Sequence, residues 1–340
     1  MRDALGRRID YLRVSVTDRC NLRCGYCVPP EGAAPFCPEE ILMDEEILTV
    51  LRVARELGIT HVRVTGGEPL VRKGIVPLVK AIKATGFPDV SMTTNGALLA
   101  EYAADLKEAG LDRVNISLDS LRPSTYRTIT GNGKLEDVLE GIRSALSAGL
   151  HPVKINVVPM KGTNESEIPD LAGLSVDSPL HVRFIEVMPV GPALGSSGVP
   201  AKDIVAEIKK RWGQLVPIPG PVGAGPAKSF RIHNAKGTVG IISAMSSPFC
   251  DECNRLRLTS DGRLRPCLSL DTEIDLKSIL RTKDPDAPKT DCDASERDLV
   301  IPKIEDGLRK AFGQALELKP KCHDFYGSHT NHRPMCQIGG

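Results

Sequence analysis

The strongest constraint on the fold is a unit that repeats through the first 190 residues, in which a β-rich run is followed by an amphipathic run and a glycine. The β-rich runs lie at residues 11–17, 61–67, 90–96, 113–119, 154–160 and 181–188. Glycines that can end the intervening helices stand just before four of the later runs, at Gly58, Gly86, Gly110 and Gly149. Asp44 is expected to cap the helix that Gly58 ends. Strands and helices that alternate in this way predict a parallel sheet with crossover helices, in an α/β barrel or partial barrel.

Polar motifs follow several of these strands. They are Cys20 to Cys27, Gly66 to Pro69, Thr93 to Gly96 and Ser117 to Asp119. In β/α barrels the chemistry gathers at the C-terminal ends of the strands. We therefore expect one face of the barrel to carry the functional site.

The pattern changes after residue 190. A helix is expected near 202–212, a Pro/Gly linker to about 227, strands at 228–234 and 238–245, a polar loop at 282–295, and a helix near 296–316. The sequence thus predicts two domains, residues 1–195 as the barrel and residues 196–340 as a C-terminal portion.

Charge and hydropathy exclude several classes of protein. Lys and Arg total 44 against 43 Asp and Glu, so no strong net field exists to hold nucleic acid or an anionic membrane. No stretch of about 18 uninterrupted apolar residues occurs, and the N-terminus has no signal-peptide core. We expect a soluble, cytoplasmic protein, whose ten cysteines serve metal binding or catalysis rather than disulfides.

Two groups of three cysteines are candidates for metal binding. Cys20, Cys24 and Cys27 follow the first strand in a CxxxCxxC loop with no histidine nearby. Because a cubane [4Fe-4S] cluster normally takes four thiolates, three would leave one iron open to another ligand. A zinc site completed by a distant residue is the alternative.

The second group, Cys250, Cys253 and Cys267, by its spacing alone indicates half of a zinc ribbon. A fourth zinc ligand would then come from Cys292, Cys322 or Cys336. Cys37 and these three cysteines have no tight spacing of their own and receive no assigned role.

Charged residues interrupt strands that are otherwise rich in Val and Ile: Arg13, Arg63, Lys154 and Arg183. Burying such cations is costly unless they are paired. They would suit an anionic ligand, but they are equally explained as outward positions or as partners of Glu68, Asp119 and Glu186. The histidines beside strands, His61, His151, His181 and His233, are expected to be structural or surface residues.

Two motifs resemble the radical S-adenosylmethionine superfamily: the CxxxCxxC loop with Tyr26 before its last cysteine, and the segment Thr65-Gly66-Gly67-Glu68-Pro69. Further segments, among them TTNG at 93–96, RFIEVM at 183–188, FCDECNRLRLTSDGRLRPCL at 249–268 and the final Gly-Gly, resemble the GTP 3',8-cyclases, the molybdenum cofactor biosynthesis protein A family. The resemblance covers essentially the whole chain.

The resemblance implies a partial (incomplete) TIM-type β/α barrel with a C-terminal α+β extension, two [4Fe-4S] clusters and S-adenosylmethionine. It assigns the first cluster to Cys20, Cys24 and Cys27 and the second to Cys250, Cys253 and Cys267. S-adenosylmethionine would contact Tyr26, Gly67, Ser117 and Met188. GTP would contact Arg13, Arg63, Thr93, Lys154, Arg255, Leu256 and Arg257, with Arg255 and Arg257 as the catalytic residues.

In this family a 5'-deoxyadenosyl radical takes the 3' hydrogen of GTP, and the product is (8S)-3',8-cyclo-7,8-dihydroguanosine 5'-triphosphate, in the first step of molybdenum cofactor biosynthesis. The resemblance implies a flavodoxin- or ferredoxin-type electron donor and a downstream cyclic pyranopterin monophosphate synthase. The tail Gly339-Gly340 would thread into the site and present its carboxylate to an arginine. The oligomeric state is open, with a homodimer as one expectation. The alternatives are another radical enzyme with an auxiliary cluster, such as a peptide-modifying one, and a structural zinc protein.

Overall fold

The computed structural model describes residues 1–29, 31–193, 195–219, 225–282, 294–325 and 333–339. Most of the expected polar loop at 282–295, with Cys292, lies outside the described residues, as does Gly340.

Six parallel strands form the centre of the fold, as predicted. They are β1 (Tyr11–Ser15), β2 (His61–Thr65), β3 (Asp89–Thr94), β4 (Arg113–Ser117), β5 (Val153–Val157) and β6 (His181–Ile185), and they pair in sequence order. Each predicted run extends two or three residues beyond the observed strand, because its last residues already belong to the loop that carries the polar motif.

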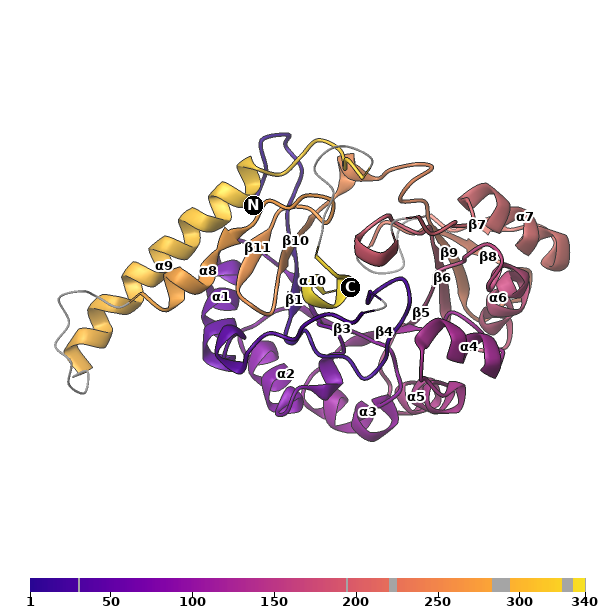
Figure 1. The fold of residues 1–340 in the computed structure, drawn as a ribbon, viewed down its shortest axis with the longest axis horizontal. Helices are drawn as coiled ribbons and strands as arrows, with labels where there is room; N and C mark the ends of the chain where they lie inside the picture. Colours follow the sequence, from indigo (N-terminus) through magenta and orange to yellow (C-terminus); the bar gives the residue numbers. More distant parts are fainter. Residues whose placement is uncertain (30, 194, 220–224, 283–293, 326–332, 340) are drawn as a thin grey trace.

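Helices cover the outer side of this curved sheet, while its inner side faces the short helix α10 (Figure 1). The outer helices are α1 (Asp44–Glu56), α2 (Ile75–Ala84), α3 (Leu99–Glu108), α4 (Pro123–Thr130), α5 (Leu135–Ser147) and α6 (Ile168–Asp177). Short 3-10 turns occur at η1 (Pro38–Glu40), η2 (Pro69–Val71), η3 (Glu165–Glu167), η4 (Gly191–Ala193) and η5 (Cys250–Glu252). The architecture is the expected partial β/α barrel.

Helix α1 shows where local prediction succeeded and where it failed. Gly58 follows the helix with φ of 95°, the left-handed ending expected of it. The predicted cap at Asp44 is wrong by one residue, since Met43 is the N-cap and its backbone N–H donates to the Glu46 carboxylate at 2.7 Å. Asp44 instead pairs with Arg72 at 2.5 Å.

The C-terminal residues extend the same sheet at both edges. Next to β6 lie β9 (Thr238–Ile242), β8 (Lys228–Arg231) and β7 (Val216–Pro217), and next to β1 lie β10 (Arg255–Leu258), β11 (Arg263–Arg265) and β12 (Ile274–Asp275). The remaining helices are α7 (Ala201–Trp212), α8 (Leu276–Leu280), α9 (Ala294–Glu317) and α10 (Met335–Ile338). The strands β10 to β12, which the sequence did not predict, place the second cysteine group beside the first strand.

Side chains alternate between the two faces of the sheet. On β1 and β10, Leu12 pairs with Leu256 and Arg13 pairs with Arg257 in register. Both leucines are fully buried in the core beneath the helices, whereas both arginines line a cavity on the inner face. None of the helices in the described ranges has the length and apolar character needed to cross a bilayer.

Candidate active site

The inner face of the sheet holds a cavity of about 330 Å³ that both cysteine groups line. Of the predicted site residues, fifteen line it: Arg13, Cys20, Cys24, Tyr26, Cys27, Arg63, Gly67, Thr93, Ser117, Met188, Cys250, Cys253, Arg255, Arg257 and Cys267. Residues separated by more than 240 positions in sequence thus share one site.

The first cysteine loop is held by the C-terminal turn of α4. The backbone N–H of Arg23 donates to Thr130 O at 2.9 Å, and that of Gly25 donates to Ile129 O at 3.1 Å. Within the loop, the N–H of Cys27 donates to Cys24 O at 2.9 Å. These bonds keep the loop irregular, as expected, and turn its thiols toward the cavity.

The Gly-Gly segment after β2 packs directly on the backbone that leads into this loop. The N–H of Gly67 donates to Thr17 O and the N–H of Glu68 donates to Arg19 O, both at 2.8 Å. A Cβ atom at Gly67 would lie 2.5 Å from Arg19 O, a distance that no side chain tolerates. The glycine is therefore required for the close approach of two chain segments.

A fully buried carboxylate stabilises the same junction. Glu68 accepts hydrogen bonds from Thr94 Oγ1 at 2.7 Å, Asn95 N at 2.7 Å and Leu70 N at 3.0 Å. Burial raises its pKa to about 7 despite these donors. The Asn95 amide in turn lies 3.8 Å from the Cys20 sulfur.

Tyr26 is held in place by a hydrogen bond to a buried carboxylate. Its hydroxyl donates to Asp119 Oδ2 at 2.7 Å, and Asp119 Oδ1 accepts from Val158 N at 2.7 Å. Burial, and after it the negative charge of Asp119, raises the pKa of Tyr26 well above its usual value, so it remains a neutral donor.

The thiols of the first group are unfavourable places for bare negative charge. Burial, followed by the nearby Asp119 and Cys20, raises the pKa of Cys24 to about 12. Burial also raises the pKa values of Cys20 and Cys27. Thiolates in this setting require a positively charged metal group, and three converging thiols on one loop fit the iron–sulfur cluster that the sequence predicts.

The second group has an electropositive setting. Although burial opposes it, the positive charges of Arg255 and Lys319 lower the pKa of Cys253 to about 6. Lys319 is buried, and its Nζ donates to Arg255 O at 2.7 Å and Pro266 O at 2.8 Å. Sequence reasoning missed Lys319, because the run KPK at 319–321 resembles an ordinary polar tail. Three thiols, one on η5, one at its C-cap and one two residues after β11, fit a second cluster.

Unbalanced positive charge lies between the two cysteine groups. The Nε atoms of Arg13, Arg63 and Arg183 are buried and have no hydrogen-bond partner among the residues that the structure describes. Burial and neighbouring arginines lower the pKa of Arg183 to about 9, and they lower the pKa of Arg13 well below its usual value. Such a group of cations is suited to a polyanion.

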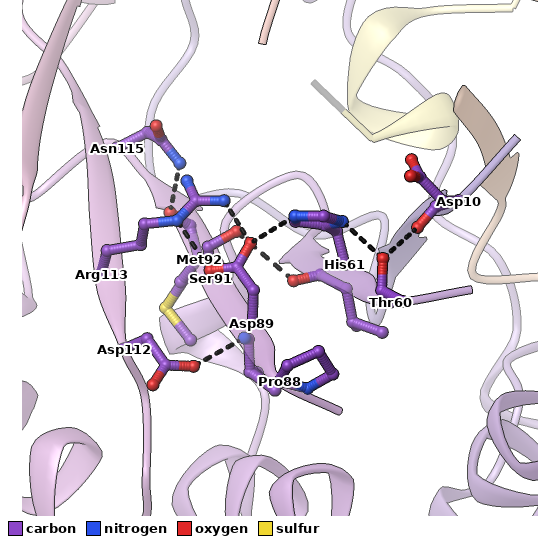
Figure 2. A network of polar contacts seen from close by, with 12 residues as sticks. Asp10, Thr60, His61, Pro88, Asp89, Ser91, Met92, Asp112, Arg113 and Asn115 are labelled. Atoms are coloured by element: carbon purple, nitrogen blue, oxygen red, sulfur yellow. Dashed lines mark hydrogen bonds and ion pairs between the residues drawn. The ribbon is translucent and has the colours of Figure 1, made fainter. Parts of the chain in front are cut away.

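The carboxylates predicted as partners of these arginines bond elsewhere. Glu186 accepts from Ser246 Oγ at 2.6 Å and from Ala201 N at 2.7 Å. Arg113 is also buried, but it has a carboxylate partner, because its Nε donates to Asp89 Oδ1 at 2.8 Å. His61 lies 3.9 Å from the same carboxylate (Figure 2). His61 is structural, as predicted.

Two predicted GTP residues do not face the main cavity. Leu256 is fully buried in the hydrophobic core, on the opposite face of β10 from Arg255 and Arg257. Lys154 lines a small separate cavity with His181 and Arg183. Burial, and then the charges of Arg183 and Arg113, lower the pKa of Lys154 to about 6.

The C-terminal segment returns to the cavity wall. Arg257 donates to Gly339 O at 2.7 Å, and a Cβ atom at Gly339 would lie 2.9 Å from Thr65 Cγ2. Cys336, buried in α10, lies near enough to Cys20 and Cys27 to affect their charge, but it does not line the cavity. Cys37 and Cys322 are exposed.

Two family models match the chain: "Radical SAM superfamily" over residues 14–174 and "Molybdenum Cofactor Synthesis C" over residues 180–325. The chain is 48% identical over 345 residues to a GTP 3',8-cyclase of Petrotoga mobilis, and 48% identical over 343 residues to one of Moorella thermoacetica, with all of each chain covered. Its fold is similar to that of Streptococcus suis SuiB bound to S-adenosylmethionine, with a TM-score of 0.58 at 16% identity over 90% of this chain and 68% of that one.

The two cysteine groups, the cavity between them and the full-length similarity agree with one another. The chain has the cysteines for two [4Fe-4S] clusters and is a radical S-adenosylmethionine enzyme. It belongs to the GTP 3',8-cyclase family of molybdenum cofactor biosynthesis.

Proposed function

We propose that this chain converts GTP to (8S)-3',8-cyclo-7,8-dihydroguanosine 5'-triphosphate in the cavity between its two cysteine groups. The observation that carries the proposal is the set of inward-facing arginines whose Nε atoms lack partners within the described ranges. A triphosphate supplies the negative charge that these residues need.

Residues 1–195 would hold S-adenosylmethionine and residues 196–340 the second cluster. In this proposal Cys20, Cys24 and Cys27 bind the first cluster, beside Tyr26, Gly67, Ser117 and Met188, which would contact S-adenosylmethionine. Cys250, Cys253 and Cys267 would bind the second cluster. When bound, the first cluster and S-adenosylmethionine supply the radical that removes the 3' hydrogen of GTP.

The protein contributes position and charge. Arg13, Arg63 and Thr93 would contact GTP from the wall formed by β1, β2 and β3, and Arg255 and Arg257 from β10. Holding the ribose against the first loop and the base toward the second fixes which carbon reacts. Arg183, which lies on β6 and is bonded to Asn115 Oδ1 at 2.7 Å and Asn156 Oδ1 at 2.6 Å, adds a rigid cation from the other half of the sheet.

Arg255 and Arg257 are the catalytic residues of the proposal. The Arg255 guanidinium lies 3.9 Å from the Cys253 sulfur and 4.9 Å from the Phe249 ring centre, so it is fixed beside the second cysteine group. A cation there stabilises negative charge that develops on the guanine as an electron arrives. Lys154 would interact with the triphosphate only from the small adjoining cavity that it lines. Leu256 would contact GTP only through its backbone, because its side chain is buried in the core.

The proposal extends to the setting of the enzyme. A flavodoxin- or ferredoxin-type donor would supply electrons, a cyclic pyranopterin monophosphate synthase would consume the product, and the chain would work in the cytoplasm, as a homodimer if it assembles. The absence of a large net charge is consistent with a small-molecule substrate.

The test is anaerobic loading with iron and sulfide, followed by incubation with dithionite, S-adenosylmethionine and GTP deuterated at the 3' position. We expect cyclised GTP together with 5'-deoxyadenosine that carries the deuterium, both measured by mass spectrometry. 5'-Deoxyadenosine without deuterium or nucleotide product would move the substrate elsewhere, and neither product from a cluster-loaded chain would overturn the enzymatic proposal.

A further inference from the structure

A second set of metal-binding groups adjoins the second cysteine group. One ligand atom each from Cys250, Cys322 and His323 lies within 4.8 Å of the other two. Cys250 begins η5, whereas Cys322 and His323 follow α9, so two distant segments of the chain meet here. Neither Cys322 nor His323 has a role in the proposed reaction.

Arg7 holds these two segments together. Its guanidinium donates to Cys250 O and to Pro320 O, both at 2.8 Å. The same guanidinium is paired through Nε with Asp3 at 2.6 Å, and both side chains are buried. The Arg7 guanidinium therefore brings the backbone of Cys250 next to the segment that carries Cys322 and His323, although the Cys322 side chain itself is exposed.

The His323 ring is oriented as a metal ligand. Its Nε2 lies 2.9 Å from Ala244 O, and because a carbonyl only accepts, Nε2 carries the proton. Nδ1 therefore has a free lone pair, and this atom is buried without a hydrogen-bond partner among the described residues. Metal-ligating histidines commonly donate their other ring N–H to a backbone carbonyl in this way. The ring of Phe325, at 4.5 Å between centroids, packs against that of His323.

The spacing fits a single ion better than a fourth cluster ligand. Sulfurs on different irons of a cubane are kept apart by the cluster, whereas Cys322 is close enough to hydrogen-bond to Cys250. Ligand atoms at about 2.0–2.3 Å from a tetrahedral zinc ion lie roughly 3.3–3.8 Å from one another. The three ligand atoms here lie within 4.8 Å of one another, so small side-chain adjustments bring them to that spacing. Two thiolates and an imidazole are a set that zinc prefers, with water in the fourth position.

We propose that Cys250, Cys322 and His323 bind a zinc ion when the second cluster is absent, and that the ion and the cluster exclude each other because both require Cys250. The second half of this inference rests on the proposed role of Cys250 in the cluster. Binding releases the protons of the two thiols to solvent and involves no oxidation or reduction. The site thus gives the cluster-free chain a metal-bound state that must be emptied before the cluster can assemble.

The first test measures zinc alone. The full-length chain, prepared without clusters and kept reduced under anaerobic conditions, is titrated with Zn²⁺ against a chromophoric chelator. We expect Cys322→Ser and His323→Asn each to lose one tightly bound equivalent, or to bind it at least about 100-fold more weakly, because one of three ligands is gone. Cys37→Ser removes an exposed thiol elsewhere and is the matched control.

Wild type and all three variants keep the first cysteine group, so any zinc bound there adds the same amount to each titration and does not affect the difference between them. Folding is checked by urea unfolding of each metal-free variant, and Cys322, being exposed, is the safer of the two substitutions. Equal zinc binding by wild type, Cys322→Ser and His323→Asn would overturn the site, because the ion would then use Cys250, Cys253 and Cys267 without them.

The second test asks whether bound zinc prevents assembly of the second cluster. The chain is loaded with zinc, then given iron and sulfide, and the second cluster is followed by iron content and electron paramagnetic resonance without GTP. We expect zinc to slow its assembly in wild type and Cys37→Ser but not in Cys322→Ser. Assembly at the same rate with and without zinc in wild type would overturn the exclusion. Failure of GTP cyclisation by a chain that carries both clusters would instead contradict the proposed function and leave the zinc result intact.

Discussion

At the scale of single residues, what distinguishes the arginines of the cavity is their lack of a counter-charge. Arg63 and Arg183 are 4% and 7% exposed, and their Nε atoms have no partner within the described part of the chain. Arg113 is equally buried, at 5% exposed, yet it is paired with Asp89. An unpaired buried charge costs several kcal/mol, roughly, so the first two arginines destabilise the empty protein and the third does not.

This contrast yields a prediction for Arg63→Gln and its control Arg113→Gln. The first change should weaken GTP binding at least about tenfold, the loss of one charge-assisted contact, while leaving the nucleotide-free chain as stable or more stable. The second should lower the unfolding free energy by about 3 kcal/mol, because Asp89 loses its partner. Calorimetric GTP titration and urea unfolding measure the two effects. Equal destabilisation by both changes would contradict the assignment of Arg63.

The two cysteine groups should also separate by substitution. Cys24→Ala should abolish S-adenosylmethionine cleavage, because the first cluster loses one of its three proposed ligands. Cys253→Ala should leave uncoupled cleavage measurable while cyclised GTP falls by at least about 100-fold, because in the proposed function the second group would contact the substrate and not S-adenosylmethionine. Mass spectrometry of 5'-deoxyadenosine and of the nucleotide checks both. If the two variants lost uncoupled cleavage equally, the groups would not have separate roles.

At the scale of elements, the turn after β2 joins three parts of the site. Glu68 is the N-cap of η2, and it bonds the end of β3 through Thr94 and Asn95 while its backbone bonds the first cysteine loop at Arg19. Among the residues that the structure describes, the carboxylate is bonded to no cation, and for this reason burial dominates its pKa.

The raised pKa of Glu68 makes the free energy of unfolding depend on pH. Its folded pKa of about 7 lies above an unfolded value of about 4.3, so the folded chain binds this proton more tightly. The resulting contribution is present below about pH 4.3 and is lost as the pH rises through about 7, a loss of about 4 kcal/mol. Glu68→Gln should remove this component, so the variant gains stability relative to wild type between pH 5 and pH 8, roughly. Urea unfolding of the cluster-free chain at several pH values measures it, and parallel pH profiles would refute the assignment.

Local signals made the elements of the first half predictable. The run of Ile47, Val50, Leu51 and Ala54 and the glycine after it specify α1 through contacts within one supersecondary unit. Strand ends were overestimated because the chain bends at Gly66 and Gly67 directly after Thr65, and Gly67 bonds the backbone that leads into the cysteine loop instead of a strand. Leu256 was assigned to GTP with its neighbours, whereas strand alternation turns it into the core.

At the scale of the whole molecule, the site exists because β10 pairs with β1. Tyr11, at the start of β1, lies in register with Arg255. This pairing brings the second cysteine group to the start of β1, across the cavity from the first cysteine loop, which follows the end of that strand. No local pattern encodes a contact between residues so far apart, so the sequence alone predicted a separate C-terminal portion and not the continuous twelve-stranded sheet. His323 was missed for the same reason, since only the fold brings it to Cys250.

The last segment of the chain completes this arrangement, and it gives a prediction with a close control. Gly339 has φ of 86°, and an added Cβ would meet Thr65 Cγ2 at 2.9 Å and Ser15 Cβ at 3.0 Å. Gly149 has φ of 71°, and a Cβ added there would meet no described atom within 4 Å, so Gly149→Ala introduces the backbone strain without a steric clash.

We expect Gly149→Ala to lower the unfolding free energy by about 1 kcal/mol with unchanged turnover. Gly339→Ala should displace the segment from Arg257 and lower GTP turnover at least about tenfold with little loss of stability, as should deletion of Gly339 and Gly340. Turnover by both tail variants at the wild-type rate would mean that the segment only covers the cavity wall and takes no part in binding GTP.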